Sequence, residues 1–210
     1  MKYDAIVLAG GKGKRLDLGY NKVFYKMDNQ KTIFENACEP FLKDDDCQKI
    51  IVVVSKEDEK YIKKEDKIIF TVNGKERFNS VYNGLKEVNS EYVMIHDGAR
   101  PYITDEDIKH LKDILLNEDA CMLGLKAKDT IKEVVDGYIT NTLDRNKIYM
   151  AQTPQCFKSK LIKDAYSKAM RDSGSFTDDA SVFEKYYDIK IKMVDSSNAN
   201  NKITFIHDLK

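Results

Sequence analysis

The chain has no paired cysteines and no excess of charge of either sign. Its four cysteines are scattered, with none in a Cys-x-x-Cys arrangement: Cys38, Cys47, Cys121 and Cys156. Such single cysteines argue against a zinc site and against a disulfide framework, and they favour a reducing cytosol. Lysine plus arginine and aspartate plus glutamate both number 35, so the formal net charge is zero. Because no long basic stripe is visible either, we expect no nucleic-acid partner.

Long apolar runs are also absent. No segment approaches membrane-spanning length, and the chain enters a strand-like run at residue 5 without a signal-peptide pattern. We therefore expect a cytoplasmic protein with no membrane association. The 210 residues suffice for one sizeable core, and no linker, repeat or low-complexity segment divides them. These observations predict a single domain over residues 1–210.

Strand-like and helix-like segments alternate along the chain. Short apolar or β-branched runs, typical of strands buried on both faces, occupy residues 5–8, 49–54, 68–71, 92–95 and 120–123. Segments with helical apolar spacing lie at residues 32–41, 57–64, 77–88 and 104–117. Thr104 followed by Asp107 resembles a capping box. This alternation predicts an α/β fold with a mostly parallel, mixed sheet flanked by helices.

Residues 130–149 interrupt this alternation. The run from Ile131 to Ile139 predicts a β-hairpin with Asp136 and Gly137 in its turn. A hairpin inserted in an α/β domain is often a protruding arm, and its apolar face must pack against something. A second subunit is the natural candidate, so we expect residues 130–149 to form a dimerisation arm.

A glycine-rich, basic loop follows the first strand. It reads Leu8-Ala9-Gly10-Gly11-Lys12-Gly13-Lys14-Arg15. Backbone N–H groups can surround an anion there and the cationic side chains add positive charge, which is typical of a loop that binds nucleotide phosphates. The spacing fits neither a P-loop nor a dinucleotide fingerprint, since Arg15 stands where a third glycine would be. A tight turn with solvated lysines is the alternative interpretation.

Polar clusters follow two further strands, at residues 73–81 and 96–101. Since ligands of open α/β sheets bind at the carboxyl ends of the strands, we expect these clusters and the glycine-rich loop to share one site. Asp97 is placed to hold Mg²⁺ or a sugar hydroxyl, with the capping of a turn as the alternative. His96 is expected to be a structural hydrogen-bonding residue.

Further motifs occur in a fixed order along nearly the whole chain. After the glycine-rich loop and Lys22 come Gly74-x-x-Arg77-x-x-Ser80-Val81, His96-Asp97-Gly98-Ala99-Arg100-Pro101, Lys128-Asp129-Thr130-Ile131-Lys132, Leu143-Asp144-Arg145-Asn146, Gln152-Thr153-Pro154-Gln155-x-Phe157, Thr177-Asp178-Asp179-Ala180-Ser181 and Asn201-Lys202-Ile203-Thr204. In these motifs the chain resembles the 2-C-methyl-D-erythritol 4-phosphate cytidylyltransferases of the non-mevalonate isoprenoid pathway. The resemblance implies a single Rossmann-like nucleotidyltransferase domain.

The resemblance also implies a reaction and the residues that serve it. The reaction is a Mg²⁺-dependent cytidylyl transfer from CTP to the sugar-alcohol phosphate, with release of pyrophosphate, in a homodimer. The residues implied as catalytic are Arg15, Lys22, Arg145 and Lys202. Those implied to bind CTP are Ala9, Gly10, Gly11, Gly13, Gly74 and Ser80. Those implied to bind the acceptor are Asp97, Arg100, Thr130, Thr153 and Thr177.

Two further details follow from the resemblance. Asp97 is a candidate ligand for Mg²⁺, although the substrate phosphates would mainly coordinate the ion. Arg145 and Thr153 are implied to lie on the arm and to reach the partner's site.

Some positions depart from the family pattern. Gly10 stands where alanine is common, Asn73 where glycine is usual and Asn21 where proline is common. Two alternatives therefore stay open: a cytidylyltransferase for an alditol phosphate such as ribitol 5-phosphate, and a nucleotide-binding regulatory protein without turnover. The motifs at residues 97–100 and 143–146 favour the methylerythritol phosphate acceptor over ribitol 5-phosphate.

Overall fold

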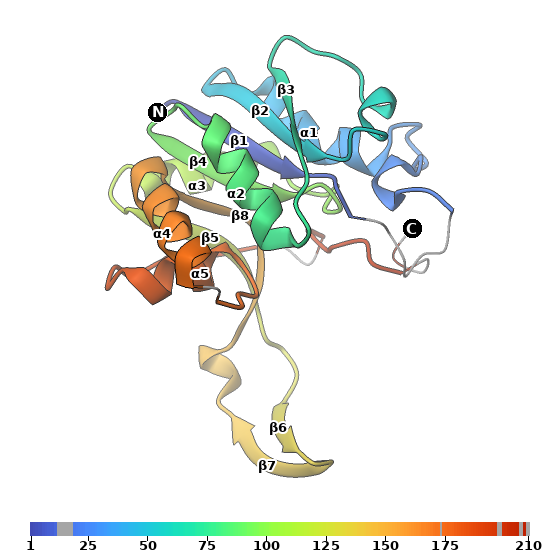
Figure 1. The fold of residues 1–210 in the computed structure, drawn as a ribbon. Helices are drawn as coiled ribbons and strands as arrows, with labels where there is room; N and C mark the ends of the chain where they lie inside the picture. Colours follow the sequence, from blue (N-terminus) through green and yellow to red (C-terminus); the bar gives the residue numbers. More distant parts are fainter. Residues whose placement is uncertain (12–18, 173, 197–198, 206–207, 209–210) are drawn as a thin grey trace.

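A computed structural model describes residues 1–11, 19–172, 174–196, 199–205 and 208. Its centre is a seven-stranded sheet in the order β3-β2-β1-β4-β8-β5-β9 (Figure 1). The strands are β1 (Tyr3–Leu8), β2 (Cys47–Val54), β3 (Ile68–Val72), β4 (Tyr92–Asp97), β5 (Ala120–Lys126), β8 (Tyr149–Lys158) and β9 (Lys192–Asp195). Strands β3, β2, β1 and β4 are parallel, β8 is antiparallel to β4 and β5, and β9 is parallel to β5. The predicted mostly parallel, mixed sheet is confirmed.

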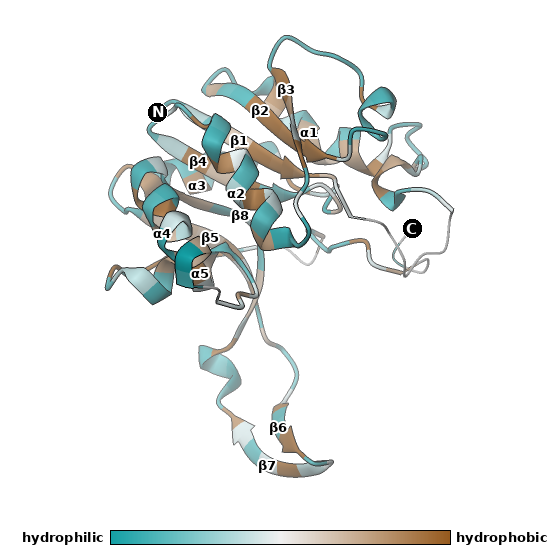
Figure 2. Ribbon diagram, in the orientation of Figure 1, coloured by the Kyte–Doolittle hydropathy of each residue, from teal (hydrophilic) through white to brown (hydrophobic). Residues whose placement is uncertain are grey.

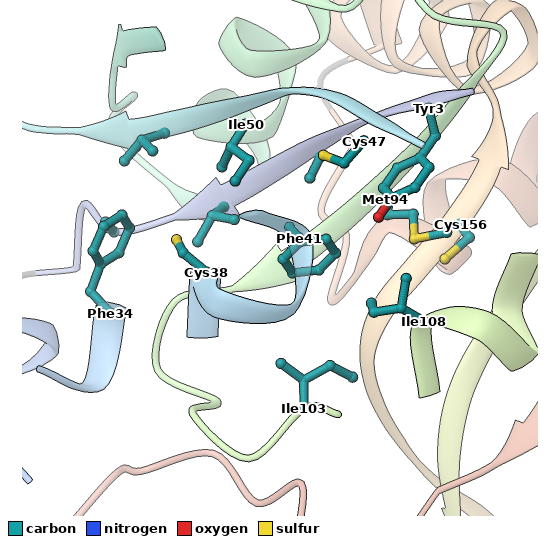
Figure 3. Packing of buried hydrophobic residues seen from close by; sticks show 14 of the residues in the cluster. Tyr3, Phe34, Cys38, Phe41, Cys47, Ile50, Met94, Ile103, Ile108 and Cys156 are labelled. Atoms are coloured by element: carbon teal, nitrogen blue, oxygen red, sulfur yellow. The ribbon is translucent and has the colours of Figure 1, made fainter. Parts of the chain in front are cut away.

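Helices cover both faces of the sheet (Figure 1). They are α1 (Ile33–Lys43), α2 (Arg77–Glu87), α3 (Asp105–Leu115), α4 (Ser159–Asp172) and α5 (Asp179–Tyr186). Side chains alternate between the faces along a strand, so Val7 of β1 packs with α1 and α3, whereas Ile6 packs with α2, α4 and α5. Figure 3 shows part of the first of these two cores, to which Cys38, Cys47 and Cys156 contribute. The sheet is therefore anchored on both faces, which fixes the positions of its strand ends.

Three of the four predicted helices are confirmed as α1, α2 and α3, and so is the capping box of Thr104 with Asp107. The fourth, at residues 57–64, is wrong, because only a 3-10 turn forms there, at Glu59–Tyr61. Ile62 is the one buried side chain of this segment and provides no continuous apolar stripe. Strands β8 and β9 and helices α4 and α5 have no counterpart among the predicted elements.

The predicted hairpin is confirmed and projects from the body of the molecule (Figure 1). Its strands are β6 (Ile131–Val135) and β7 (Tyr138–Leu143). Asp136 and Gly137 occupy the turn at φ values of 51° and 85°, the left-handed conformation that a tight two-residue hairpin turn requires. The two strands form a sheet of their own and are not hydrogen-bonded to the main sheet.

The four cysteines are free and buried. Within the described part of the chain, no helix is long and apolar enough to cross a bilayer.

Candidate active site

A cleft of about 820 Å³ opens at the carboxyl ends of β1, β3 and β4. Its lining comprises Leu8, Gly10, Gly11, Lys22, Val23, Val53, Asn73, Gly74, Lys75, Glu76, Arg77, Ser80, Asp97, Ala99 and Lys202. The three polar clusters that follow these strands therefore surround one cavity, as the sheet topology predicts.

Gly98 holds the loop after β4 against the end of β1. Leu8 pairs with Asp97 in the parallel register, and the Gly98 N–H donates to the Leu8 carbonyl at 2.9 Å. A Cβ at position 98 would lie 2.8 Å from that carbonyl oxygen, so any side chain would push the loop away. Glycine at this position therefore allows Asp97 to lie next to the start of the glycine-rich loop.

Asp97 is a buried carboxylate surrounded by cations. Its Oδ2 accepts a hydrogen bond from Lys202 Nζ at 2.8 Å, and its Oδ1 lies 3.4 Å from Arg77 Nε. Arg100 Nε lies 3.8 Å from Oδ2. Burial alone would raise the pKa of Asp97, but the three cations outweigh burial and hold its pKa well below the usual range. Asp97 is therefore ionised at neutral pH and gathers three positive groups, of which Arg77 and Lys202 line the cleft.

Arg77 connects the cleft to helix α5. Its two terminal nitrogens donate to the two carboxylate oxygens of Asp179 at 2.9 and 2.8 Å. Asp179 is fully buried and also accepts from the hydroxyl of Tyr166 at 2.5 Å. Burial lowers the pKa of Arg77, but Asp179 and Asp97 raise it well above its ordinary value. A bidentate pair fixes the plane of a guanidinium, so Arg77 is held as a permanently charged group on the cleft wall.

His96 and Thr153 fix the backbone of Asp97. His96 Nε2 lies 3.1 Å from the Arg100 carbonyl oxygen, which can only accept, so Nε2 carries the proton and donates. Nδ1 then accepts from the Thr153 hydroxyl at 3.1 Å, and this hydroxyl accepts from the Asp97 N–H at 3.0 Å. Burial lowers the pKa of His96 to about 4, so the ring is neutral at pH 7. His96 therefore has the structural hydrogen-bonding role expected of it.

A C-terminal segment, residues 199–204, is fastened to the cleft. Lys22 Nζ donates to the Ile203 carbonyl at 2.6 Å, and the Ile203 N–H donates to the Ala99 carbonyl at 2.9 Å. Arg100 donates through Nη1 to the Asn200 carbonyl at 2.8 Å. Lys22 is only 8 % exposed, so it is not a solvated loop lysine. These bonds bring the C-terminal segment and the residues after β1 and β4 to one place.

The structure gathers many of the predicted site residues but not all of them. Those that line the cleft are Gly10, Gly11, Lys22, Gly74, Ser80, Asp97 and Lys202. Ala9 is buried at its edge, with its N–H donating to the Val53 carbonyl at 2.8 Å, and Arg100 is buried beside Asp97. Gly13 and Arg15 lie outside the described residues.

The remaining predicted residues lie elsewhere. Thr130, Arg145 and Thr177 are exposed and do not line the cleft. Arg145 is at the base of the arm, where its Nη1 donates to the Lys128 carbonyl at 2.9 Å. The implied placement of Thr153 on the arm is wrong, because this residue lies within β8 and is 4 % exposed. Its hydroxyl is bonded to Asp97 and His96 of its own chain, since β8 rejoins the main sheet before residue 153.

Sequence reasoning missed the residues that hold the cations in place. Arg77 belongs to the segment at residues 74–80 that the resemblance implies binds CTP, but its sequence position gives it no separate role, and it gives none to the fully buried Asp179, which pairs with it. The signals that could have identified them are the position of Arg77 as the first residue of α2 and the double aspartate Asp178-Asp179 before α5. Asn200, which is fully buried and donates to the Thr153 carbonyl at 3.0 Å, carried no such signal.

The arrangement is suited to binding anions. Within the described residues, no group of three or more His, Cys, Asp or Glu side chains could hold a metal ion. The oxygens of Asp97 are already engaged by Lys202 and Arg77. The surroundings of Asp97 therefore do not fit a resident Mg²⁺ site, whereas fixed cations at a cleft favour ligands that carry several phosphate groups.

Comparison with known proteins gives a consistent match. The family model described as 2-C-methyl-D-erythritol 4-phosphate cytidylyltransferase matches residues 4–210. The chain is 39% identical over 219 residues to a protein of that name from Clostridium novyi, with 98% of this chain and 92% of the relative covered. It is 36% identical over 216 residues to one from Clostridioides difficile, with 99% and 90% covered.

Solved structures agree with the sequence comparisons. A 4-diphosphocytidyl-2C-methyl-D-erythritol synthase from Anaerococcus prevotii has a TM-score of 0.88 at 32% identity, with 99% of this chain and 93% of that chain covered. A 2-C-methyl-D-erythritol 4-phosphate cytidylyltransferase from Francisella tularensis has a TM-score of 0.86 at 30% identity, with 100% and 97% covered. Both are similar to this chain over its whole length, which includes the cleft and the arm.

Proposed function

The chain belongs to the 2-C-methyl-D-erythritol 4-phosphate cytidylyltransferase family, and we propose that it transfers the cytidylyl group of CTP to 2-C-methyl-D-erythritol 4-phosphate, releasing pyrophosphate. This reaction serves the synthesis of isoprenoid precursors. The observation that carries the proposal is the set of fixed cations, Lys22, Arg77 and Lys202, around one cleft at the carboxyl ends of the strands. A cavity of this kind accepts two anionic substrates at once.

The proposed reaction needs charge stabilisation more than it needs a base. The second pKa of a phosphate monoester is about 6, so the acceptor phosphate is largely dianionic at neutral pH. One of its oxygens attacks the α-phosphorus of CTP. A new P–O bond forms as the bond from the α-phosphorus to the leaving oxygen breaks, and pyrophosphate departs with that bond's electron pair. His96 is not suited to act as a base, because both ring nitrogens are engaged inside the protein.

The cations then have two tasks. They bring the two anions together, and they stabilise the additional charge that develops on the transferring phosphoryl group and on the leaving pyrophosphate. Lys22 and Lys202 both line the cleft, and Arg77 is held beside them by Asp179. Asp97 orients Lys202 and Arg77, and we propose that it also contacts a hydroxyl group of the acceptor.

Magnesium is proposed to arrive with the nucleotide. Mg²⁺ typically keeps several waters and binds through substrate phosphates together with one or two carboxylates. Because the cations around Asp97 do not favour a resident ion, we propose that CTP binds as its magnesium complex. Magnesium would neutralise part of the triphosphate charge, and the protein cations would act on the remainder.

A homodimer is the proposed assembly. The tip of the arm exposes apolar side chains on both of its faces, since Val134 pairs with Ile139 and Val135 pairs with Tyr138; all four side chains are more than half exposed. Figure 2 shows these hydrophobic segments on the projecting hairpin. An isolated two-stranded hairpin is marginally stable in water, so a second subunit that covers the tip would stabilise it. Arg145 at the base of the arm would then reach the partner's cleft.

The buried free cysteines support a reducing, cytoplasmic setting.

The acceptor is tested by measuring pyrophosphate release from CTP and Mg²⁺ with different sugar-alcohol phosphates. We expect rapid release with 2-C-methyl-D-erythritol 4-phosphate and a kcat/KM at least about tenfold lower with ribitol 5-phosphate, because an acceptor that leaves buried polar groups unpaired loses at least one hydrogen bond. A higher kcat/KM with ribitol 5-phosphate would overturn the acceptor assignment. Absence of release with every acceptor would favour a nucleotide-binding regulatory protein.

A further inference from the structure

Residues 152–154 of β8 form an irregular part of the main sheet. The register with β4 ends at Gln155, and the register with β5 passes from Gln155 directly to Ala151, so residues 152–154 are paired with no residue of these two described strands. This stretch is nevertheless buried, since Thr153 is only 4 % exposed. Its polar backbone groups therefore cannot rely on a regular ladder, and a distant segment supplies hydrogen bonds to them.

Asn200 supplies the hydrogen bond to the Thr153 carbonyl. Its Nδ2 donates to this carbonyl at 3.0 Å, and the Asn200 side chain is fully buried. The Thr153 hydroxyl in turn accepts from the Asp97 N–H at 3.0 Å. Thr153 thus connects Asn200 to the backbone of Asp97 through two direct hydrogen bonds.

A second route connects Asn200 to the same aspartate. The Asn200 carbonyl accepts from Arg100 Nη1 at 2.8 Å, and the Arg100 N–H donates to the Asp97 carbonyl at 3.0 Å. Lys202 follows Asn200 by two positions and donates to Asp97 Oδ2 at 2.8 Å. The backbones that carry Lys202 and Asp97 are therefore held together through Asn200, in addition to the contact between the two charged groups.

Lys202 needs this support because its side chain is long and 38 % exposed. An ammonium group on a flexible four-carbon stem keeps a defined position only where the backbone beneath it is fixed. On the C-terminal side of Lys202, the Ile203 N–H donates to the Ala99 carbonyl at 2.9 Å. On the N-terminal side, Asn200 anchors the segment to β8.

The amide of Asn200 is satisfied on one side only. In the described part of the chain, its buried Oδ1 has no hydrogen-bond partner. An unpaired buried acceptor destabilises the folded state, so alanine at this position would remove one unfavourable group together with one favourable bond. We therefore expect the Asn200 side chain to contribute little to stability.

We propose that Asn200 is a positioning residue of the transfer reaction: by holding residues 199–204 to β8, it keeps the Lys202 ammonium group at Asp97, where this group meets the substrate phosphates. This proposal rests on the proposed function, in which Lys202 acts on those phosphates. Asn200 is fully buried and is not among the residues that line the cleft, so it acts through Lys202 and not on a substrate.

The positioning role is tested by a double-mutant cycle with Lys202. Asn200→Ala is expected to lower kcat/KM for the acceptor by about 10- to 100-fold, because a displacement of about 1 Å at a reacting group has an effect of this order. In a Lys202→Ala background, the same change should lower kcat/KM by less than about threefold, since the group through which Asn200 acts is already gone. Asn201→Ala is the matched control and should leave kcat/KM unchanged, because Asn201 is adjacent, exposed and not part of the cleft lining.

Thermal unfolding of the same variants separates positioning from a purely structural role. The Tm of Asn200→Ala should fall by no more than about 5 °C, so the protein stays folded while its activity falls. If Asn200→Ala does not fold, Asn200→Ser keeps a polar group in the buried site and takes its place in the cycle. Equal losses of kcat/KM in the two backgrounds, or a folded variant with normal kcat/KM, would overturn the proposal.

Amide hydrogen exchange follows the same segment without turnover. In Asn200→Ala, the Ile203 N–H is expected to exchange at least about tenfold faster than in the wild type or in Asn201→Ala, because the segment opens more readily. Unchanged exchange would show that Asn200 does not hold the segment and would overturn the proposal. A wild-type protein that transfers the cytidylyl group to no acceptor would contradict the proposed function instead, and faster exchange of Ile203 would still show that Asn200 fixes the backbone of Lys202.

Discussion

Replacing Lys22 with alanine is expected to lower kcat by about 10² to 10³, the range found when one preorganised group that stabilises transition-state charge is removed. The KM for CTP should rise much less, because the lysine acts chiefly on charge that develops during the transfer. Lys22 also donates to the Ile203 carbonyl and is 8 % exposed. We therefore expect the variant to lose about 1 kcal/mol of unfolding free energy as well.

The matched control is Lys26→Ala, since Lys26 lies four residues further along and is exposed. Its kcat and its midpoint of urea unfolding should stay close to those of the wild type. Steady-state kinetics across a range of CTP concentrations separates kcat from KM. A Lys22→Ala variant with near-normal kcat and reduced stability would show that this lysine only fastens the C-terminal segment.

Mixing two inactive variants should restore activity if the arm completes the partner's site. Lys22→Ala and Arg145→Ala are each expected to be nearly inactive. In a mixed dimer of C₂ symmetry, one site would carry both lesions and the other would carry neither. With random exchange at equal concentrations, about half of the dimers are mixed and about a quarter of all sites are intact. Recovery should therefore approach a quarter of wild-type activity.

A second mixture controls for indirect effects. Lys22 and Lys202 line the same cleft, so each site of a mixed dimer of Lys22→Ala and Lys202→Ala would carry one lesion, and no activity should return. Native mass spectrometry verifies that mixed dimers have formed. Verified mixed dimers of Lys22→Ala and Arg145→Ala without recovery would place Arg145 in its own subunit's site and contradict the exchange of arms.

The location of the site could be predicted from the sequence because a parallel sheet binds its ligands at the carboxyl ends of its strands, and the sequence shows where those strands end. The loop after β1 and the residues after β3 and β4 carry glycines, charges and few bulky apolar side chains, and a parallel sheet brings such segments to one edge. The Asp136-Gly137 turn likewise predicts the hairpin from local backbone requirements alone. Local rules of this kind need no knowledge of distant contacts.

What could not be predicted depends on contacts between distant segments. Asp179 lies 102 positions from Arg77, and the pair exists only because α5 packs beside the start of α2. The resemblance implies that Thr153 lies on the arm, but β8 returns to the sheet and buries it against His96. The helix predicted at residues 57–64 fails for a different and local reason: its only apolar residues, Tyr61 and Ile62, are adjacent, so they form no apolar stripe by which packing could stabilise a helix.

The central claim is that an oxygen of the acceptor phosphate attacks the α-phosphorus of CTP. It is tested most directly with an acceptor whose phosphate carries oxygen-18 in its terminal oxygens, followed by mass spectrometry of both products. The account predicts that all of the oxygen-18 remains in the product in which the acceptor is joined to cytidine through a diphosphate. The released pyrophosphate should contain none of the label. Labelled pyrophosphate, or CMP formed with oxygen from water in place of the labelled product, would contradict it.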